Sequence, residues 1–369
     1  MNNKLSILHI INNLDKKNFS IYSLIKKHYS FFKKDYQFYL ITSLNKLSNK
    51  ENFVHLNTGN IFNKINFFLN FLNNKKIKII HVHGIWTIKD LLYLYLCKAK
   101  KISIYIHPHG MLLKEALLNK GFLNYIKKII YIKFFYRLFL PNNCNFVSIT
   151  KKETKSIKLF FKKNQVYLIN NFATEKNYLK QKPHKSKTFI CLTRINKHKN
   201  LHKLIDTFSK LNLKPKWKLD IYGIKDDDDY FKLLKNQIKS NNIKNIIRIK
   251  KPVFGKLKKK IIDKSWCNIL ISKSEVISQS VIDSANNYLP SIISKNIIES
   301  GWIKNGCLCC TNLEDSFNKT IIKSTNWSLY ERILRGNKIN KFIKKKYDIK
   351  RILNILKKIY KNNLQKISE

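Results

Sequence analysis

The residues best placed for chemistry are two carboxylates, Glu275 and Asp283, which stand in a strand, loop and helix pattern. The apolar, β-branched run at 268–272 predicts a buried strand, and Pro290 follows the helix that comes next. This pattern is one βαβ unit of a parallel sheet, so Glu275 falls in the loop after a strand and Asp283 on the helix. Backbone N–H groups at a helix start attract phosphate, and we expect the start near Gln279 to hold a phosphorylated ligand beside Glu275.

The spacing of the two acids resembles the E-x7-E signature of retaining glycosyltransferases of the GT-B type, in particular family 4, with Asp283 in place of the second Glu. In that family the first carboxylate usually touches the transferred sugar and the second binds the ribose of the nucleotide. The resemblance implies these roles for Glu275 and Asp283. Ile277-Ser278 replaces the family's Phe-Gly, and we expect Ser278 to cap the helix that begins at Gln279, so that both belong to the donor site. The alternative is that the two acids lie on a solvated loop and helix.

Arginine and lysine occur in an earlier loop, which follows a strand predicted at 188–192. Arg194 and Lys199 resemble the family's strand-G-R-x4-K-G element, with Thr193 and Asn200 in place of the two glycines. The leaving nucleoside diphosphate gains negative charge as the glycosidic bond breaks, and fixed cations stabilise that charge without a metal ion. The resemblance therefore implies that Arg194 and Lys199 hold the donor diphosphate.

Histidines follow two strands predicted in the first half, in the runs His81-Val82-His83-Gly84-Ile85-Trp86 and His107-Pro108-His109-Gly110-Met111. The runs resemble the H-x-H-G-x-W and S-P-H-G-M loops of the same family, in which a histidine lines the cleft opposite the donor sugar. The resemblance implies that His109 is a catalytic contact to the substrate. It also implies acceptor-side loops that contain His83, Gly84, Trp86 and Gly110.

Zinc is the competing interpretation of these histidines, because each pair could donate two ligands. We expect the two members of a pair to lie on opposite faces of their strand, and no acid or cysteine stands beside them. No metal is therefore expected, and no other cofactor. The acidic run at 226–229 is interpreted as a solvated loop or a helix start, rather than as a metal-binding D-x-D motif.

The length of 369 residues suits two domains, and the strand and helix patterns alternate through both halves. The resemblance implies an α/β GT-B fold with two Rossmann-like, doubly wound domains facing across a cleft. We expect an acceptor-side domain at 1–180, a donor-binding domain at 181–347, and a last helix at 348–369 that packs back on the first domain. The strands expected are Leu5–Ile11, Gln37–Thr42, Ile77–Val82, Ile102–Ile106, Phe146–Thr150 and Val166–Ile169, followed by strands around Phe189, Leu219, Ile246, Ile269, Ile292 and Cys307.

The net charge of +51, from 73 Lys and Arg against 22 Asp and Glu, would by itself suggest a nucleic-acid partner. Lys, Asn, Ile, Phe and Tyr are abundant together, and their codons are rich in A and T, so biased base composition explains much of this excess. No nucleic-acid-binding motif accompanies the lysines. We therefore expect a nucleotide-sugar donor and a lipid-linked or glycan acceptor as partners, together with an anionic membrane surface, and no nucleic acid.

The run at 122–140 is apolar and aromatic but is interrupted by Lys127, Lys128, Lys133 and Arg137. These charges exclude a comfortable membrane span, and two interpretations stay open: an interfacial helix or a core helix with a solvated basic edge. The apolar run at 5–11 lacks a cleavage site of small residues, so we expect a cytoplasmic protein, with a peripheral position at the inner face of the membrane as the variant. The seven cysteines are expected to be reduced and mostly buried.

These features together predict a metal-independent retaining glycosyltransferase of the hexosyltransferase type. It would move a sugar from a nucleotide donor to a hydroxyl of an envelope polysaccharide or lipopolysaccharide. Two alternatives remain. A GT-B protein could have lost its activity with the replaced family glycines, or a basic protein could bind anionic membrane or nucleic acid, with an affinity that falls steeply with salt.

Overall fold

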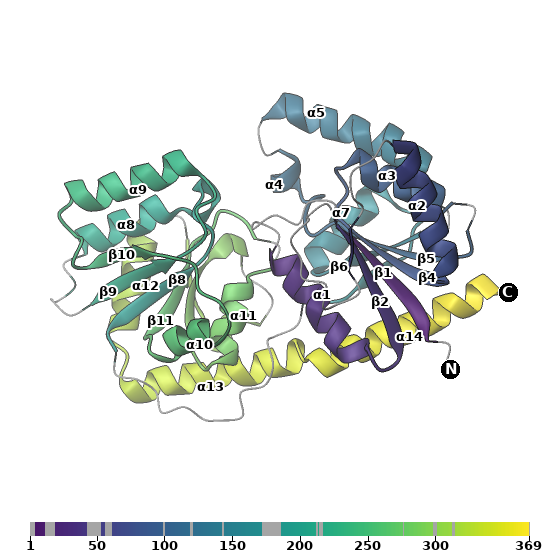
Figure 1. Ribbon diagram of the computed structural model, residues 1–369. Helices are drawn as coiled ribbons and strands as arrows, with labels where there is room; N and C mark the ends of the chain where they lie inside the picture. The colour runs from purple at the N-terminus through teal and green to yellow at the C-terminus, as the bar shows by residue number, and fades with distance from the viewer. Residues whose placement is uncertain are drawn as a thin grey trace. The chain divides into compact units, whose positions relative to one another are not determined.

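The computed structural model describes residues 4–11, 19–42, 53–55, 61–98, 100–118, 121–141, 144–171, 186–211, 213, 217–275, 277–297, 301–311 and 314–368. The chain forms two compact units (Figure 1). Unit 1 comprises Met1–Asn171 and Lys350–Glu369, and unit 2 comprises Phe172–Ile349. Two further stretches of interest fall mostly outside the described residues: the run at 15–20, which has no glycine after the first strand, and the polar, lysine-rich run at 174–187, which the sequence suggests as a linker.

Unit 1 is built on a parallel sheet of seven strands in the order β3-β2-β1-β4-β5-β6-β7. The strands are β1 (Leu5–Ile11), β2 (Tyr36–Thr42), β3 (Phe53–His55), β4 (Ile77–His83), β5 (Ser103–His107), β6 (Cys144–Ser148) and β7 (Val166–Leu168). The order reverses between β1 and β4, as a doubly wound sheet requires. All six strands predicted for this half form, whereas β3 was not predicted. The strand β6 ends earlier than predicted because Thr150 already caps the next helix.

The segments between these strands are mostly helical, as crossovers between parallel strands must be. The helices of unit 1 are α1 (Phe19–Phe32), α2 (Ile61–Asn74), α3 (Ile88–Leu96), α4 (Lys114–Leu117), α5 (Phe122–Ile130), the π-helix η2 (Tyr131–Tyr136), α6 (Arg137–Phe139), α7 (Lys151–Phe160) and α14 (Ile349–Ser368).

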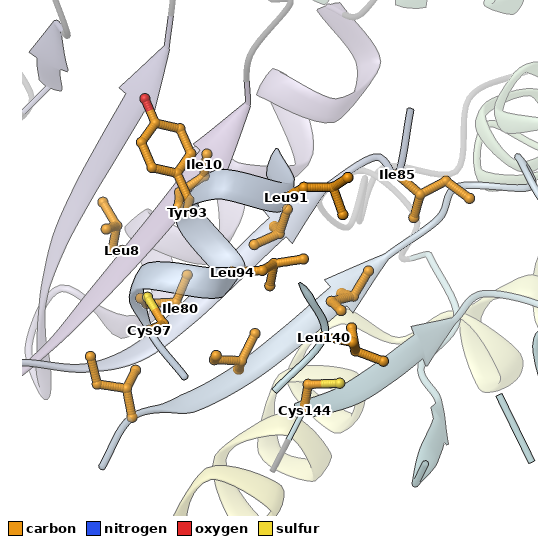
Figure 2. Packing of buried hydrophobic residues seen from close by; sticks show 14 of the residues in the cluster. Leu8, Ile10, Ile80, Ile85, Leu91, Tyr93, Leu94, Cys97, Leu140 and Cys144 are labelled. Atoms are coloured by element: carbon orange, nitrogen blue, oxygen red, sulfur yellow. The ribbon is translucent and has the colours of Figure 1, made fainter. Parts of the chain in front are cut away.

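Alternation along the central strands gives the sheet of unit 1 one apolar face. Leu8 and Ile10 of β1 and Ile80 of β4 point to this side, where they pack with Leu91 and Leu94 of α3 (Figure 2). These side chains are almost fully buried. Removing them from water supplies the main folding free energy of this unit.

The opposite face of the same strands is polar and rich in histidine. His9 lies on β1, His81 and His83 lie on β4, and His107 lies on β5, all of them buried. Residues two apart on a strand share a face, so His81 and His83 point to the same side. Their rings stack at a centroid distance of 6.4 Å, and the expectation that they lie on opposite faces was wrong.

Helix α14 covers this histidine face, with α1 beside it (Figure 1). The hydroxyl of Tyr360 lies 2.6 Å from Nε2 of His81. Asn363 donates from Nδ2 to the hydroxyl of Tyr105 at 2.8 Å. The last helix therefore supplies hydrogen-bond partners that the buried polar groups of β4 and β5 need.

Unit 2 repeats the architecture with six parallel strands in the order β10-β9-β8-β11-β12-β13. The strands are β8 (Thr188–Leu192), β9 (Lys218–Tyr222), β10 (Ile247–Lys250), β11 (Cys267–Leu270), β12 (Ser291–Ser294) and β13 (Leu308–Cys310). All six lie within one residue of the positions predicted. The helices are α8 (Leu201–Lys210), α9 (Asp228–Ser240), α10 (Gly255–Asp263), α11 (Gln279–Asn286), α12 (Glu314–Thr325) and α13 (Leu329–Lys346), with short 3₁₀ turns at η3 (Lys197–Lys199) and η4 (Lys295–Ile297).

Both faces of the second sheet are apolar. Phe189 of β8 and Ile269 of β11 pack on one side with Phe208 of α8, in a cluster that also includes α9 and α12. Leu270 of β11 packs on the other side with Ile282 of α11, in a cluster that also includes α13. Helices thus cover both faces and leave the strand ends as the place for polar loops.

The segment 122–140 contacts the core with one side only: Ile132, Tyr136 and Leu140 belong to the buried cluster, and Tyr125, Ile129, Tyr131 and Phe139 pack against it. No residue of α5 or α6 is buried, and η2 buries only Ile132 and Tyr136. Its exposed large apolar residues are Phe122, Leu123, Ile126, Ile130, Phe134, Phe135 and Leu138. Among the described residues, no helix has the length and apolar character needed to cross a membrane.

The cysteines are free thiols, and all are buried except Cys309, which is partly exposed. Burial raises the pKa of Cys191 and Cys307 to about 12. Such thiols stay protonated and behave as small apolar side chains.

Candidate functional site

In unit 2 the predicted motifs meet at the point where the strand order reverses. The neighbours β8 and β11 run parallel, so their carboxyl ends open at the same edge of the sheet. The loop after β8 carries Arg194 and Lys199, and the loop after β11 carries Glu275. Ligands of doubly wound sheets bind in the crevice at such a reversal.

The two loops are tied together by their backbones and by an ion pair. The N–H of Lys273 donates to the carbonyl of His198 at 2.8 Å. Nζ of Lys199 contacts Oε1 of Glu275, and the two side chains are only 9% and 17% exposed. Ser272 donates to the same oxygen at 2.9 Å. The predicted phosphate-binding lysine and sugar-binding carboxylate are therefore in direct contact.

Asn200 explains how the loop tolerates the loss of a family glycine. Its φ of 53° and ψ of 28° are left-handed, a conformation that favours glycine and that asparagine accepts most readily among the other residues. Its Nδ2 also donates to the carbonyl of Ile271 at 3.3 Å. Thr193, at the other replaced glycine, is not among the residues with positive φ. Both replacements therefore have backbone conformations that a residue with a side chain can adopt.

Arg194 is half exposed, and its nearest charged partner is Asp226, with Nη1 3.7 Å from Oδ2. Asn196 donates to the same Oδ2 at 2.9 Å, so Asp226 holds the Arg194 loop from the end of β9. Asp227 caps α9 by accepting from the N–H of Tyr230. The interpretation of the acidic run as a helix start is confirmed, whereas the contact of Asp226 with Arg194 was not predicted.

Asp283 is buried on α11 and is held from two sides. Nζ of Lys258 contacts Oδ2, and Nε2 of Gln279 donates to Oδ1 at 2.9 Å. Ser278 caps the helix, because its hydroxyl accepts from the N–H of Val281. The expected cap is confirmed. Lys258 was missed, since one lysine among so many gives no signal in the sequence.

In unit 1 the loop after β5 forms a tight turn around His109. His109 and Gly110 have φ values of 50° and 82°, and the N–H of Met111 donates to the carbonyl of Pro108 at 3.0 Å. Positive φ at both central residues is typical of a type I′ turn. Histidine adopts the left-handed region more readily than most residues, and glycine does so without strain. His109 therefore lies in the turn that follows β5 and not on the strand itself.

Glu153 fixes this turn from helix α7. Its fully buried carboxylate accepts from the N–H of Gly110 at 2.5 Å and from the N–H of Ile149 at 2.7 Å. Burial raises its pKa, against the lowering effect of the two backbone hydrogen bonds. Sequence analysis assigned Glu153 no role, although Thr150 and Glu153 form the T-x-x-E pattern of a capping box.

The side chains of the predicted acceptor loops form hydrogen-bonded chains of imidazoles. Nδ1 of His83 lies 2.9 Å from Nε2 of His109, and Nε2 of His83 lies 3.0 Å from Nδ1 of His9. Nδ1 of His81 lies 2.7 Å from Nε2 of His107. His83 is buried, so its ring contacts the neighbouring imidazoles and is shielded from solvent.

A metal ion is the alternative occupant of this cluster, because one nitrogen from each of His83, His107 and His109 lies within 4.8 Å of the others. The rings are nearly parallel: the planes of His83 and His107 differ by 23°, and those of His83 and His109 by 11°. The lone pairs of parallel rings do not converge on one point, as tetrahedral coordination requires. The arrangement suits hydrogen bonds between imidazoles better than a shared ion.

The remaining acceptor-loop residues connect this cluster to the exposed apolar segment. Gly84 has a φ of 109°, which glycine allows, and its N–H donates to the carbonyl of His107 at 2.9 Å. Trp86 packs on Tyr131 of η2, with ring centroids 5.8 Å apart, and Nζ of Lys128 lies 5.7 Å from the centre of its ring. The loop after β4 therefore rests on the segment 122–140.

A separate hollow of about 550 Å³ lies at the amino ends of β1 and β2. It is lined by Lys4, Lys33, Lys75 and Lys76 among other residues. Parallel sheets bind their ligands at the carboxyl ends of the strands, and none of the predicted site residues lines this hollow. We therefore do not assign it to the site.

Comparison with known proteins adds independent findings. Residues 172–368 match the model of the family described as glycosyl transferases group 1. The chain is similar to the structure of a glycosyltransferase from Rickettsia africae, with a TM-score of 0.76, 12% identity, and coverage of 98% of this chain and 99% of that one. Anabaena HepE in complex with UDP-glucose gives a TM-score of 0.75 and 11% identity, with 97% and 100% covered. The structure of WaaG, a glycosyltransferase involved in lipopolysaccharide biosynthesis, gives a TM-score of 0.70 and 9% identity, with 96% of this chain and 99% of that chain covered. No curated protein matches the sequence.

Acid should destabilise unit 1 through its buried histidines. Burial lowers the pKa of His9, His81, His83 and His107, and it lowers that of His28 to about 4 from an ordinary 6.5. The unfolded chain therefore binds protons below pH 6.5 that the folded unit excludes. We expect the free energy of unfolding to fall between pH 7 and pH 5, by up to about 1.4 kcal/mol per pH unit for each fully buried histidine.

Urea unfolding followed across this pH range measures the effect. The variant His28→Phe should have a shallower pH slope than the wild type, because one proton-binding site is removed from the unfolded state. A stability that does not change between pH 7 and pH 5 would contradict the expectation.

Breaking the ion pair between Lys199 and Glu275 should destabilise unit 2. Glu275→Gln leaves a lysine that is 7% exposed without its counter-charge. We expect a loss of about 2–4 kcal/mol in the free energy of unfolding. The double variant Lys199→Met/Glu275→Gln should recover part of this loss, and denaturant unfolding of the four proteins in the cycle measures the coupling. A loss in the double variant equal to the sum of the losses in Lys199→Met and Glu275→Gln would mean that the pair is not coupled.

Proposed function

Since the chain belongs to the glycosyl transferases group 1 family, we propose that it is a retaining glycosyltransferase that uses a nucleotide-sugar donor. Its two-unit α/β fold is the GT-B fold predicted from the sequence. The proposed acceptor is a hydroxyl of a lipid-linked or envelope glycan, and the proposed chemistry is of the hexosyltransferase type and does not depend on a metal ion. The contact between Lys199 and Glu275, beside the start of α11, is the observation that carries the proposal.

That contact suits a nucleotide-sugar because the donor has two chemically different parts that must bind side by side. The diphosphate needs cations, and the sugar needs hydrogen-bond acceptors for its hydroxyls. Lys199 and Glu275 offer one of each at the same point. Lys199 and Ser272 both contact Glu275 at Oε1, so among the described residues Oε2 is left for sugar hydroxyls.

In the proposed mechanism, the donor diphosphate is held by Arg194, by Lys199 and by the start of α11 at Ser278 and Gln279. The side chain of Arg194 is 48% exposed, and its guanidinium can form two parallel hydrogen bonds to phosphate oxygens. The N–H groups at the helix start add a partial positive charge. These groups stabilise the charge that the leaving group gains, and the acceptor attacks from the face that the phosphate leaves.

Asp283 is proposed to bind the ribose diol. Lys258 and Gln279 each occupy one of its oxygens, which fixes the orientation of the carboxylate. A carboxylate oxygen accepts more than one hydrogen bond, so two ribose hydroxyls can add to those already made. The shorter side chain of Asp is compensated by this support. No part of this site calls for a cofactor.

We place acceptor binding on unit 1, at the loops that contain His83, Gly84, Trp86 and Gly110, with His109 as the catalytic polar contact. The support is their common position at the carboxyl ends of β4 and β5. Trp86 packs against η2, so the acceptor loops adjoin the exposed apolar segment. A lipid-linked acceptor would need an apolar surface of this kind beside its binding loops.

Peripheral binding to an anionic membrane is the second part of the proposal. Phe134 and Leu138 are each 68% exposed, and Leu123 is 77% exposed. Lys127, Lys133 and Arg137 are interspersed with them, which gives the pattern of an interfacial helix. The apolar side chains would enter the headgroup region, and the basic ones would pair with anionic lipid.

A single nucleotide should stabilise the protein selectively. We expect one of UDP, GDP, ADP and CMP, at about 100 times its dissociation constant, to add about 2.7 kcal/mol to the free energy of unfolding. For a unit of this size that gain corresponds to an increase in melting temperature of about 5–10 °C. Arg194→Ala should lower the affinity by roughly 10–100-fold, because a charge-assisted contact to phosphate is lost. Thermal unfolding at about physiological salt measures both.

Lys197→Ala is the matched control, because it removes one positive charge from the same loop at an exposed position. Loss of the stabilisation in Arg194→Ala but not in Lys197→Ala would identify a specific phosphate contact. If no nucleotide stabilises the protein, the GT-B protein is inactive or acts at surfaces. Binding that collapses with salt and ignores Arg194 and Glu275 would favour the basic binding protein.

Vesicle flotation tests the membrane part. We expect the wild type to float with vesicles that contain phosphatidylglycerol, and Phe134→Ser/Leu138→Ser to bind at least about tenfold more weakly, since fully burying such a side chain is worth about 1.5–3 kcal/mol. Leu159→Ser is the control, because Leu159 is 73% exposed on α7 outside the segment. Unchanged flotation of the double variant would show that the apolar residues do not enter the membrane.

A further inference from the structure

Three imidazoles form a hydrogen-bonded row in unit 1 that ends at the predicted catalytic residue. His9 is fully buried, His83 is 5% exposed, and His109 is partly exposed at the turn after β5. The row joins Nδ1 of His9 to Nε2 of His83, and Nδ1 of His83 to Nε2 of His109. Nδ1 of His109 is the one nitrogen at the outer end of the row.

The protons of such a row are not independent. A neutral imidazole has one N–H donor and one acceptor nitrogen. If His9 donates from Nδ1, His83 must accept at Nε2 and donate from Nδ1, and His109 must accept at Nε2 and carry its proton on Nδ1. If the direction is reversed, Nδ1 of His109 is an acceptor. The position of the proton on His9 therefore decides whether Nδ1 of His109 is a donor or an acceptor.

The surroundings of His9 indicate which of its two ring nitrogens bears the proton. Its Nε2 is buried and has no hydrogen-bond partner among the described residues. The rings of His28 and Phe38 pack against the ring of His9, with their centroids 6.0 and 5.7 Å from its centroid. A buried N–H without a partner is rarer than a buried acceptor without one, because a donor has a single hydrogen to place. His9 therefore keeps its proton on Nδ1, and the row runs outward as donor to acceptor.

A second row beside the first has the same direction. The hydroxyl of Tyr360 lies against Nε2 of His81, whose Nδ1 contacts Nε2 of His107. A phenol is a good donor to imidazole, so His81 accepts at Nε2 and donates from Nδ1 to His107. The rings of the two rows stack, His9 on His81 and His83 on His107, each at 4.6 Å.

Burial keeps the rows neutral. Desolvation lowers the pKa of His9 and of His83, and it lowers the pKa of His109 to about 4. The charged groups nearest to the turn do not reverse this, because Glu153 is used by two backbone N–H groups. At neutral pH each imidazole carries one proton, as the tautomer argument assumes.

We propose that His9 and His83 are positioning residues, which fix the proton of His109 on Nδ1 so that it presents a neutral hydrogen-bond donor to an oxygen of the bound substrate. The part that concerns substrate rests on the proposed function. A sugar hydroxyl oxygen or a phosphate oxygen would accept this hydrogen bond.

The inference has a chemical consequence for the proposed transfer. An N–H donor cannot take the proton of the acceptor hydroxyl, so His109 is not the general base. The proton passes to the departing diphosphate oxygen. The new bond joins the acceptor oxygen to the anomeric carbon, and the bond that breaks joins that carbon to the phosphate oxygen. The products are the glycoside and the protonated nucleoside diphosphate.

Nitrogen NMR of the full chain labelled with ¹⁵N-histidine tests the tautomer without any substrate. Two-bond correlations distinguish a nitrogen that bears hydrogen from one that does not, and His109→Gln assigns the signal. We expect Nδ1 of His109 to bear the proton at pH 7. A proton on Nε2, or a charged ring, would overturn the proposal whatever the fate of the proposed function.

Variants test the direction of the row. His9→Phe keeps a stacked ring but removes the inner donor, so the His109 signal should shift toward the Nε2–H form and kcat/KM should fall roughly tenfold. His9→Gln restores a donor and should restore the Nδ1–H form. Tyr360→Phe breaks only the second row and should leave His109 unchanged. If His9→Phe leaves the tautomer of His109 as it is, or Tyr360→Phe alters it, the row does not fix that proton.

Discussion

The reversal of strand order in each parallel sheet is the constraint on which the site depends. Parallel neighbours end at the same edge, and a reversal between them sends the following crossovers to opposite faces, which leaves the edge open. In unit 2 this brings Lys199 and Glu275 into contact from loops far apart in the sequence. In unit 1 it places the loop after β4 next to the end of β1. The charged and polar groups can be concentrated there because helices already cover both faces of each sheet.

Concentrating polar groups inside a protein is tolerable only if each has a partner. The two units supply most of these partners by different chemistry, although Nε2 of His9 has none among the described residues. Unit 2 neutralises charge with charge, in the pairs of Lys199 with Glu275 and of Lys258 with Asp283. Unit 1 places neutral imidazoles in rows, where each ring satisfies the next. We propose that the ion pairs of unit 2 bind a charged ligand, and that the imidazole row of unit 1 presents a single N–H group.

The sequence predicted the strands well because isoleucine-rich runs between polar segments are a strong local signal, and it missed β3 because Phe53–His55 is too short to give one. The candidate site residues were chosen through the spacing of motifs. Their partners were not, because the contacts of Lys258 with Asp283 and of Asp226 with Arg194 join segments that no local pattern links. Other signals were present but misread. Period-two alternation already puts His81 and His83 on one face. Thr150 and Glu153 form the T-x-x-E pattern that indicates a helix start.

Lysine is so abundant in this chain that a candidate site lysine cannot be recognised from its residue type. Burial distinguishes such a lysine from those on solvated surfaces. A lysine on a solvated helix face keeps its hydration and contributes mainly to the net charge, whatever the genome that encodes it. Lys199 is 7% exposed and contacts a carboxylate, so its position is fixed before any ligand arrives. Fixed charges stabilise a developing charge without reorganising, which mobile surface lysines cannot do. The excess of positive charge is therefore no guide to the partner, whereas the few cations that the fold restrains are the ones that we propose to hold a phosphorylated ligand.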